Sequence, residues 1–285
     1  MRLPLSSALA DRAREYAAGV RSPVEPRQAA TVALLRPGAG GPEVYLLRRH
    51  SGMAFAHGMY VFPGGGVDPR DDEEVGWAGP GPEVWAARLG VDEALARALV
   101  CAAVRETFEE SGVLLAGPDG ASVVADTTGD DWEADRLALE ARELSLTDLL
   151  RRRGLVLRAD LLGAWSGWLT PEFEPRRYRT WFFVAELPAG QRTRDVSTES
   201  DAVAWLPLAG AVAGADAGEI AMLPPTYLTC LELASYAGPE EALAACEGRM
   251  VEMFMPELVD DPEPALSNPP WLDGLIAAHL GEGRS

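Results

Sequence analysis

Residues 92–112 carry the pattern that most constrains the fold of this 285-residue chain. Asp92 is a typical N-cap residue, and Gly112 is typical of the left-handed position that ends a helix. An apolar stripe recurs between them at helical spacing, made of Leu95, Leu99, Ala102, Ala103 and Val104. The pattern predicts one long helix from about Glu93 to Ser111.

The end of this helix carries three carboxylates on one side, within the segment Arg105-Glu106-Thr107-Phe108-Glu109-Glu110-Ser111-Gly112. Glu106 and Glu110 lie about 40° apart around a helix, and Glu109 lies about 60° from Glu106 on its other side. Like charges at this spacing cost a few tenths of a kcal/mol each. Hard divalent cations take several oxygen ligands, so the crowding indicates a cation. On these residues alone, a solvated acidic face with an Arg105–Glu109 pair is the alternative interpretation.

An upstream segment favours the cation: Phe62-Pro63-Gly64-Gly65-Gly66-Val67-Asp68-Pro69-Arg70-Asp71. Together the two segments resemble the signature of the Nudix hydrolases. That signature is a glycine, five residues, a glutamate, seven residues, then Arg-Glu-x-x-Glu-Glu-x-Gly and an aliphatic residue. Its second half matches at every fixed position from Arg105 to Val113, and its first half aligns Gly65 with the glycine and Asp71 with the first glutamate.

The sequence departs from the signature in two ways. Asp71 replaces a glutamate, which shortens the reach of one carboxylate. The spacing from Asp71 to Arg105 is about 26 residues longer than the signature permits, and such an insertion costs little where it lengthens a surface loop. An interrupted signature of this kind resembles the coenzyme A diphosphatase-like subgroup of the family.

The resemblance covers residues 30–207 and implies an α/β fold, a Nudix-type α/β/α sandwich with a mixed sheet. Residues 1–29 are expected to form an N-terminal helix and a linker. The insertion, about residues 72–91, is expected to be a surface loop with one short helix. Residues 208–285 are expected to form a helical C-terminal extension, with two helices that begin at prolines, near 221–236 and 238–248, and an irregular tail.

The rest of the sequence predicts shorter elements. Two β-rich runs joined by a Pro/Gly turn predict a hairpin, at 30–35 and 43–48. Other β-rich runs are 58–62, 161–169, 179–187 and 201–206. Helices are expected at 132–144 and at 147–153, with Thr147 as the N-cap of the second. Three aromatic residues of one strand are expected in the core rather than in base stacking: Trp181, Phe182 and Phe183.

The resemblance also implies roles for single residues. Glu109 and Glu110 would be the main ligands of Mg²⁺ or Mn²⁺, and Glu106 a ligand or a general base. Gly64 would offer a carbonyl to the metal, and Arg105 would orient the glutamates through charge-assisted hydrogen bonds. A metal ion lowers the pKa of a bound water and clamps phosphate oxygens, which is what hydrolysis of a phosphoanhydride needs.

Members of the family often take a further carboxylate from a later loop. Glu199 is the leading candidate for this catalytic role, with Glu172, Glu174 and Asp201 as alternatives. His57, beside the Gly-rich turn, is expected to be a structural hydrogen-bonding residue rather than a catalyst.

Arginines are the candidates for substrate binding. Arg48 and Arg49 stand just before the position where the coenzyme A pattern of the family expects an arginine, and Gly58 fits that pattern. Arg177 and Arg179 lie in an arginine-rich segment, 170–179, and would contact a substrate phosphate or simply balance nearby glutamates. The leading substrate is coenzyme A or an acyl derivative, and ADP-ribose or NADH comes next. A Nudix-like regulator without turnover is the rival hypothesis, although the intact set of three glutamates argues against it.

Composition limits the partners. The formal net charge of -19 and the pI near 4.5 disfavour nucleic acids and anionic membranes, which are bound mainly through phosphates. No apolar run reaches about 18 residues, and residues 1–19 do not form a signal peptide, so a cytoplasmic location is expected. The three cysteines share no metal-binding spacing and are expected to be buried. By analogy with the family we expect a homodimer.

Overall fold

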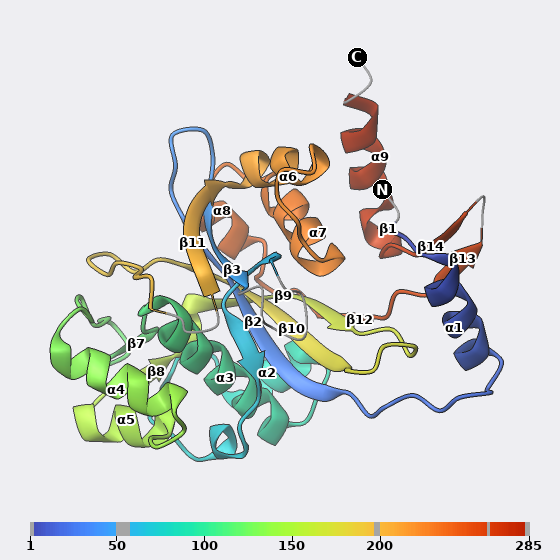
Figure 1. Ribbon diagram of the computed structural model, residues 1–285. Helices are drawn as coiled ribbons and strands as arrows, with labels where there is room; N and C mark the ends of the chain where they lie inside the picture. Colours follow the sequence, from blue (N-terminus) through green and yellow to red (C-terminus); the bar gives the residue numbers. More distant parts are fainter. Residues whose placement is uncertain (1–2, 50–57, 197–199, 261–262, 283–285) are drawn as a thin grey trace. The chain divides into compact units, whose positions relative to one another are not determined.

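The computed structural model describes residues 3–49, 58–196, 200–260 and 263–282 (Figure 1). The chain divides into two compact units. The larger unit consists of Gln28–Ser166 and Trp181–Glu252, and the smaller unit of Met1–Arg27, Gly167–Thr180 and Met253–Ser285.

A sheet forms the centre of the larger unit, with strands β11 (Ser200–Pro207), β3 (Glu43–Arg49), β2 (Arg27–Arg36), β10 (Tyr178–Glu186) and β9 (Leu162–Leu169) in this order. β2 and β3 form the predicted hairpin, in which Leu35 lies opposite Val44. Two short strands complete the sheet beside it: β4 (Tyr60–Val61) pairs with β3, and β5 (Gly64–Gly66) pairs with β2. The predicted α/β fold with a mixed sheet is confirmed.

The long helix α3 runs from Glu93 to Ser111, as predicted. The side chain of Asp92 accepts a hydrogen bond from the Leu95 amide at 2.8 Å, which fixes the first turn. Gly112 ends the helix in the left-handed region, at φ +74°, where a residue with a Cβ would be strained. The helix is largely buried because both α2 and the Gly-rich strand β5 pack against it.

The insertion has the predicted short helix, but this helix packs on the core through Trp85 and Leu89. Its helix α2 (Pro82–Leu89) lies beside α3 in Figure 1, and Trp85 is fully buried, with its ring centroid 5.8 Å from that of Phe183 on β10. The indole N–H of Trp181 donates to the Leu89 carbonyl at 3.1 Å. A further strand, β6 (Trp77–Ala78), pairs with β8 (Val156–Arg158), which also pairs with β7 (Ala116–Gly117). Trp85 and Leu89 therefore anchor an otherwise exposed segment on the core.

The remaining helices of the larger unit agree with the sequence patterns in part. α4 (Asp130–Glu140) and α5 (Leu146–Arg153) are present, but Ser145 rather than Thr147 caps α5, with its hydroxyl 3.1 Å from the Asp148 amide. α6 (Leu208–Asp216) was not predicted. α7 (Pro224–Leu233) and α8 (Pro239–Ala244) both begin at a proline, as expected.

The chain after β11 returns to the strand that precedes the Gly-rich turn. The Tyr60 amide of β4 donates to the Ala221 carbonyl at 2.8 Å, and Tyr60 forms a parallel bridge with Met222. Residues of the C-terminal extension thus complete the hydrogen bonding of β4 on the side away from β3.

The smaller unit is built around a three-stranded sheet in the order β1 (Leu3–Pro4), β14 (Pro264–Leu266) and β13 (Leu258–Asp260). α1 (Ser7–Ala17) covers it through a cluster of Ala13, Phe173 and Leu266. The prediction of an irregular tail is therefore wrong, because β14 pairs with β1 of the N-terminal segment and with β13. The unit also contains β12 (Met253–Phe254), paired with the end of β9, the turn η3 (Pro270–Leu272) and α9 (Asp273–Glu282).

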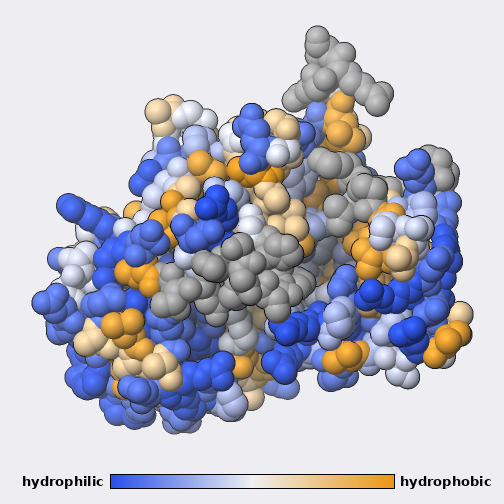
Figure 2. All heavy atoms as spheres, in the orientation of Figure 1, coloured by the Kyte–Doolittle hydropathy of each residue, from blue (hydrophilic) through white to orange (hydrophobic). Residues whose placement is uncertain are grey.

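Burial follows the sequence patterns closely. Trp181, Phe182 and Phe183 lie in the core, and all three cysteines are buried and free, as predicted. Hydrophilic residues cover much of the face in Figure 2, as the charge content requires. Across the described ranges, the structure contains no helix with the length and apolar character needed to cross a membrane.

Truncation of the buried tryptophan of the insertion tests its place in the core. We expect Trp85→Ala to lower the free energy of unfolding by about 3–5 kcal/mol, because it leaves a large cavity between α2 and β10. Val84→Ala on the same helix, where the side chain is 37% exposed, is the matched control and should cost less than about 1 kcal/mol. Equal losses in urea titrations of the two variants would show that the insertion is only a surface loop.

Candidate functional site

The Gly-rich strand β5 and the end of α3 meet at one place. The Gly64 amide donates a hydrogen bond to Glu110 Oε2 at 2.8 Å. A Cβ on Gly65 would collide with the carboxylate of Glu106, and a Cβ on Gly64 would collide with Thr31 and the Ala30 carbonyl of β2. Only glycine allows the strand and the glutamates to approach this closely. The two halves of the interrupted motif are therefore adjacent in space.

Arg105 joins the carboxylates of both halves. Its guanidinium donates to Glu106 Oε1 at 2.7 Å and to Glu109 Oε1 at 3.3 Å. The other Nη donates to Asp71 Oδ2 at 2.9 Å and to the Gly66 carbonyl at 2.8 Å. Burial lowers the pKa of Arg105, but the surrounding carboxylates outweigh it and raise the pKa above its usual value. The arginine is thus charged and held in one orientation.

Asp71 occupies the position where the motif has a glutamate. Its side chain is 2% exposed and accepts hydrogen bonds from Arg105 and from the Asp68 amide. Asp68 in turn accepts from the Arg70 amide, so the two aspartates form a capping box on the short helical turn η1 (Pro69–Asp72). Because η1 packs directly on α3, the shorter aspartate side chain reaches Arg105.

Charge crowding perturbs Glu109. Burial, and after it the neighbouring Glu106, raises the pKa of its carboxyl group, Arg105 lowers it, and the net value is about 7. Arg105 thus does not fully offset the effects of burial and of Glu106. Additional positive charge beside Glu109 would stabilise its ionised form.

The donor set suits a hard divalent cation. Three carboxylates lie on the last turns of one helix, next to the backbone of a Gly-rich strand, and oxygen ligands of this type are those of Mg²⁺ and Mn²⁺. As placed, no three acidic, histidine or cysteine side chains within the described ranges surround a common point. Glu106 and Glu109 point toward Arg105, and Glu110 points toward the Gly64 amide. To bind here, a cation would have to replace Arg105 and the Gly64 amide as the partners of these oxygens.

Two arginines that sequence reasoning missed lie at the end of α3. Arg136 of α4 donates to the Glu109 carbonyl at 2.8 Å, and Arg194 makes a 2.6 Å ion pair with Glu133 of α4. The hydrogen bonds from Arg136 and then from Arg194 hold the pKa of Glu133 below its usual value, against the effect of burial. The spacing of Glu133, Arg136 and Glu140 is a sequence signal for ion pairs along one helix, but it does not indicate the contact with α3.

The other predicted site residues are dispersed. Arg48 pairs with Asp201 at 2.6 Å across β3 and β11, and Arg49 ends β3. Glu199 and His57 lie outside the described residues. The remaining four belong to the smaller unit: Glu172, Glu174, Arg177 and Arg179.

Arg177 is mostly enclosed within the smaller unit. Its side chain donates to the carbonyls of Thr170 and Val24, both at 3.0 Å, and the residue is 6% exposed. Contacts with backbone carbonyls are typical of an arginine that holds loops together. Its role in substrate binding stays a prediction.

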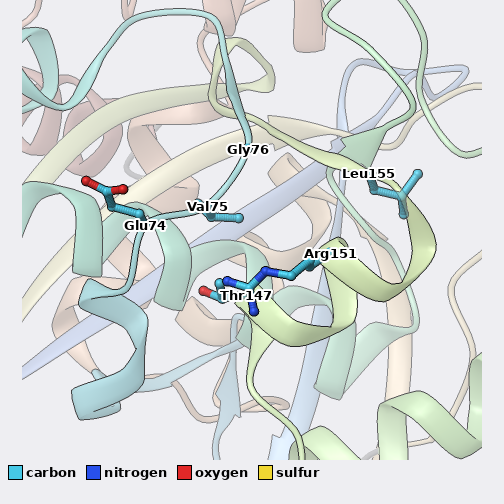
Figure 3. A pocket seen from close by; sticks show the side chains of 6 residues that line it. All are labelled: Glu74, Val75, Gly76, Thr147, Arg151 and Leu155. Carbon is cyan, nitrogen blue, oxygen red and sulfur yellow. The ribbon is translucent and has the colours of Figure 1, made fainter.

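A pocket of about 220 Å³ lies elsewhere in the larger unit (Figure 3). It is lined by residues of the insertion, of α5 and of the segment after it: Glu74, Val75, Gly76, Thr147, Arg151 and Leu155. None of the motif carboxylates lines this pocket, so it is not the candidate site.

The family model of the NUDT19 Nudix domain matches residues 90–233, half of the chain, including α3 and its glutamates. The chain belongs to this Nudix hydrolase family. The match begins after the Gly-rich turn and Asp71, so the contacts of Arg105 link the first half of the motif to the matched region.

Known proteins resemble this Nudix chain over most of its length. It is 28% identical to acyl-coenzyme A diphosphatase NUDT19 of Gallus gallus, over 78% of this chain and 73% of that protein. It is also 28% identical to "Putative nudix hydrolase 7" of Caenorhabditis elegans, over 64% of this chain and 52% of that protein, so the match spans about half of the nematode relative. The crystal structure of a Nudix hydrolase from Alicyclobacillus acidocaldarius superposes with a TM-score of 0.64, 26% identity and coverage of 80% of this chain and 99% of that one. The predicted Nudix fold is confirmed.

Removal of the Asp71 charge tests whether the two halves of the Nudix motif are held together by Arg105. We expect Asp71→Asn to lower the free energy of unfolding by about 3 kcal/mol, because Arg105 loses a buried charge partner. The neighbouring variant Asp72→Asn removes a carboxylate that is 54% exposed and 3.8 Å from Arg97, and should cost less than about 1 kcal/mol. Chemical denaturation of both variants makes the comparison, and equal losses would contradict this account.

The raised pKa of Glu109 predicts how metal binding depends on pH. A cation binds the ionised carboxylate, so below pH 7 it must displace a proton, and affinity for Mn²⁺ should fall by up to about tenfold per pH unit. Without metal, the raised folded pKa has the opposite consequence: it favours the folded state at acidic pH, and this contribution is lost as pH rises from about 4.5 through about 7. Titrations with Mn²⁺ between about pH 5.5 and pH 8 measure the first effect. Glu109→Gln should flatten the profile, and a profile that stays the same in this variant would assign the proton to another group.

Proposed function

We propose that the protein hydrolyses a phosphoanhydride bond in a nucleoside diphosphate linked to another group, with Mg²⁺ or Mn²⁺ as cofactor. The observation that carries the proposal is the junction of Glu106, Glu109 and Glu110 with the Gly-rich strand, held by Arg105. Membership of the Nudix hydrolases supports the reaction class.

Each residue at this junction has a proposed role. Glu109 and Glu110 hold the cation, Glu106 is a further ligand or the general base, and Gly64 offers its carbonyl. When bound, the cation supplies an activated water and neutralises charge on the substrate phosphates. Arg105 fixes the carboxylates in position, and its contact with the Gly66 carbonyl holds the glycine strand against them. Glu199 stays our candidate for the further catalytic carboxylate from a later loop.

The leading substrate is coenzyme A or an acyl derivative. The similarity to acyl-coenzyme A diphosphatase NUDT19 of Gallus gallus supports this choice. Coenzyme A carries a 3′-phosphate, which requires a cation in an otherwise acidic protein, and Arg48 is 43% exposed at the end of β3. ADP-ribose and NADH are the second choice, since they share the diphosphate but lack that phosphate.

A panel of substrates tests the proposal. The full chain is incubated with Mg²⁺ or Mn²⁺ and with coenzyme A, ADP-ribose, NADH or a diadenosine polyphosphate, and the products are identified. We expect 3′,5′-ADP and 4′-phosphopantetheine from coenzyme A. Products only from ADP-ribose or NADH would favour the second choice, and no turnover with either metal would favour a regulator that binds without catalysis.

Variants in the same assay connect turnover with the site. We expect Glu109→Gln or Glu110→Gln to lower turnover at least about 100-fold, the scale of losing the charge stabilisation of a metal. Glu93→Gln, at the exposed first turn of the same helix, is the control and should retain activity. Retained activity in both site variants would remove these glutamates from the mechanism.

A further inference from the structure

The end of α3 combines two unfavourable features. The last turn carries Glu109 and Glu110 and contains no basic residue. A helix C-terminus already bears partial negative charge, and its last four carbonyls have no partner within the helix. Groups from outside the helix must therefore offset the charge and donate to these carbonyls.

Residues beyond the Nudix motif supply these groups. Arg136 donates to the Glu109 carbonyl at 2.8 Å, the Arg194 amide donates to the Ser111 carbonyl at 2.9 Å, and the Thr127 hydroxyl donates to the Gly112 carbonyl at 2.6 Å. Ring packing between Phe108 of α3 and Trp132 of α4 holds the two helices together at a centroid distance of 6.2 Å. These three hydrogen bonds hold the last turn of α3 and its cap Gly112.

Arg136 is the most constrained member of this set. Only 1% of the residue is exposed, and its guanidinium binds Glu133 at 2.7 Å and Glu140 at 3.0 Å besides the Glu109 carbonyl. Glu133 is shared with Arg194, whose side chain lies so close to Gly112 that a Cβ there would contact its guanidinium. The guanidinium of Arg136 therefore has a fixed position relative to the backbone of a proposed metal ligand.

We propose that Arg136 is a positioning residue for the metal site: it fixes the backbone of the last turn of α3, from which Glu109 and Glu110 reach a divalent cation. The inference rests on the proposed function only in taking these two glutamates as the metal ligands. Arg136 lies outside the motif, which ends at Val113, and it acts through the Glu109 backbone rather than on substrate.

A merely structural role for Arg136 makes a different prediction. If the residue only anchors α4, its loss lowers stability and leaves the affinity of the folded protein for metal unchanged. Arg158 is the matched control, because it is 6% exposed, forms a fork with Asp160 and donates to the Ser122 carbonyl, all away from the last turn of α3.

The test measures Mn²⁺ binding to the full chain by the electron paramagnetic resonance signal of free Mn²⁺, with no substrate present. We expect Arg136→Gln to weaken binding about tenfold or more, the usual scale for removing a group that orients a ligand. Arg136→Lys keeps a cation and one hydrogen bond and should recover part of this loss. Arg158→Gln should lower the melting temperature while changing Mn²⁺ affinity less than about twofold.

Several results would overturn the inference. Folded Arg136→Gln with the affinity of the wild type would do so, and so would an equal loss of affinity in Arg158→Gln. If Arg136→Gln does not fold, wild-type affinity in Arg136→Lys would count against the positioning role, because lysine cannot reproduce the fork with Glu133 and Glu140. If the wild-type protein binds Mn²⁺ but hydrolyses no diphosphate, the proposed function is contradicted. The Mn²⁺ affinities of the Arg136 and Arg158 variants still decide whether Arg136 positions the metal ligands. Wild-type protein that binds no Mn²⁺ would remove both.

Discussion

The site depends on the hydrogen bonds and ion pairs of the buried Arg105 guanidinium. This guanidinium binds Asp71 and the Gly66 carbonyl from the first half of the motif and Glu106 and Glu109 from the second. A charge this deeply buried is stable only when each of its donors has a partner, so displacement of either half leaves the other uncompensated. The long insertion between the halves is therefore compatible with one compact site.

Local signals in the sequence predict this part of the molecule well. Asp92, Gly112 and the apolar spacing between them define α3, and the glycines before Val67 identify a close approach of backbone to side chains. The remainder depends on partners far away in the chain. Trp85 of the insertion is buried because Phe183 is available on β10, and the tail forms strands because β14 pairs with both β1 and β13. The sequences of these segments alone do not show which distant strands they will contact.

The electrostatic properties of the site likewise depend on burial and packing that the sequence pattern does not show. Periodicity places Glu106, Glu109 and Glu110 on one stripe, but the raised pKa of Glu109 follows from its burial, which the sequence does not report. Likewise, the arginine between Glu133 and Glu140 has the spacing of an ordinary exposed ion pair. Only the packing of α4 against α3 brings it to the backbone of Glu109.

The strand β4, which precedes the Gly-rich turn of the Nudix motif, pairs with Ala221 and Met222. An open strand edge is a template for association with other chains, also beside a Gly-rich turn. Here the chain covers that edge with its own later segment, more than 150 residues away in sequence. A fragment that ends at β11 would keep every motif residue but would expose the Tyr60 amide. The motif in this protein therefore cannot be transferred to another chain without the segment after β11.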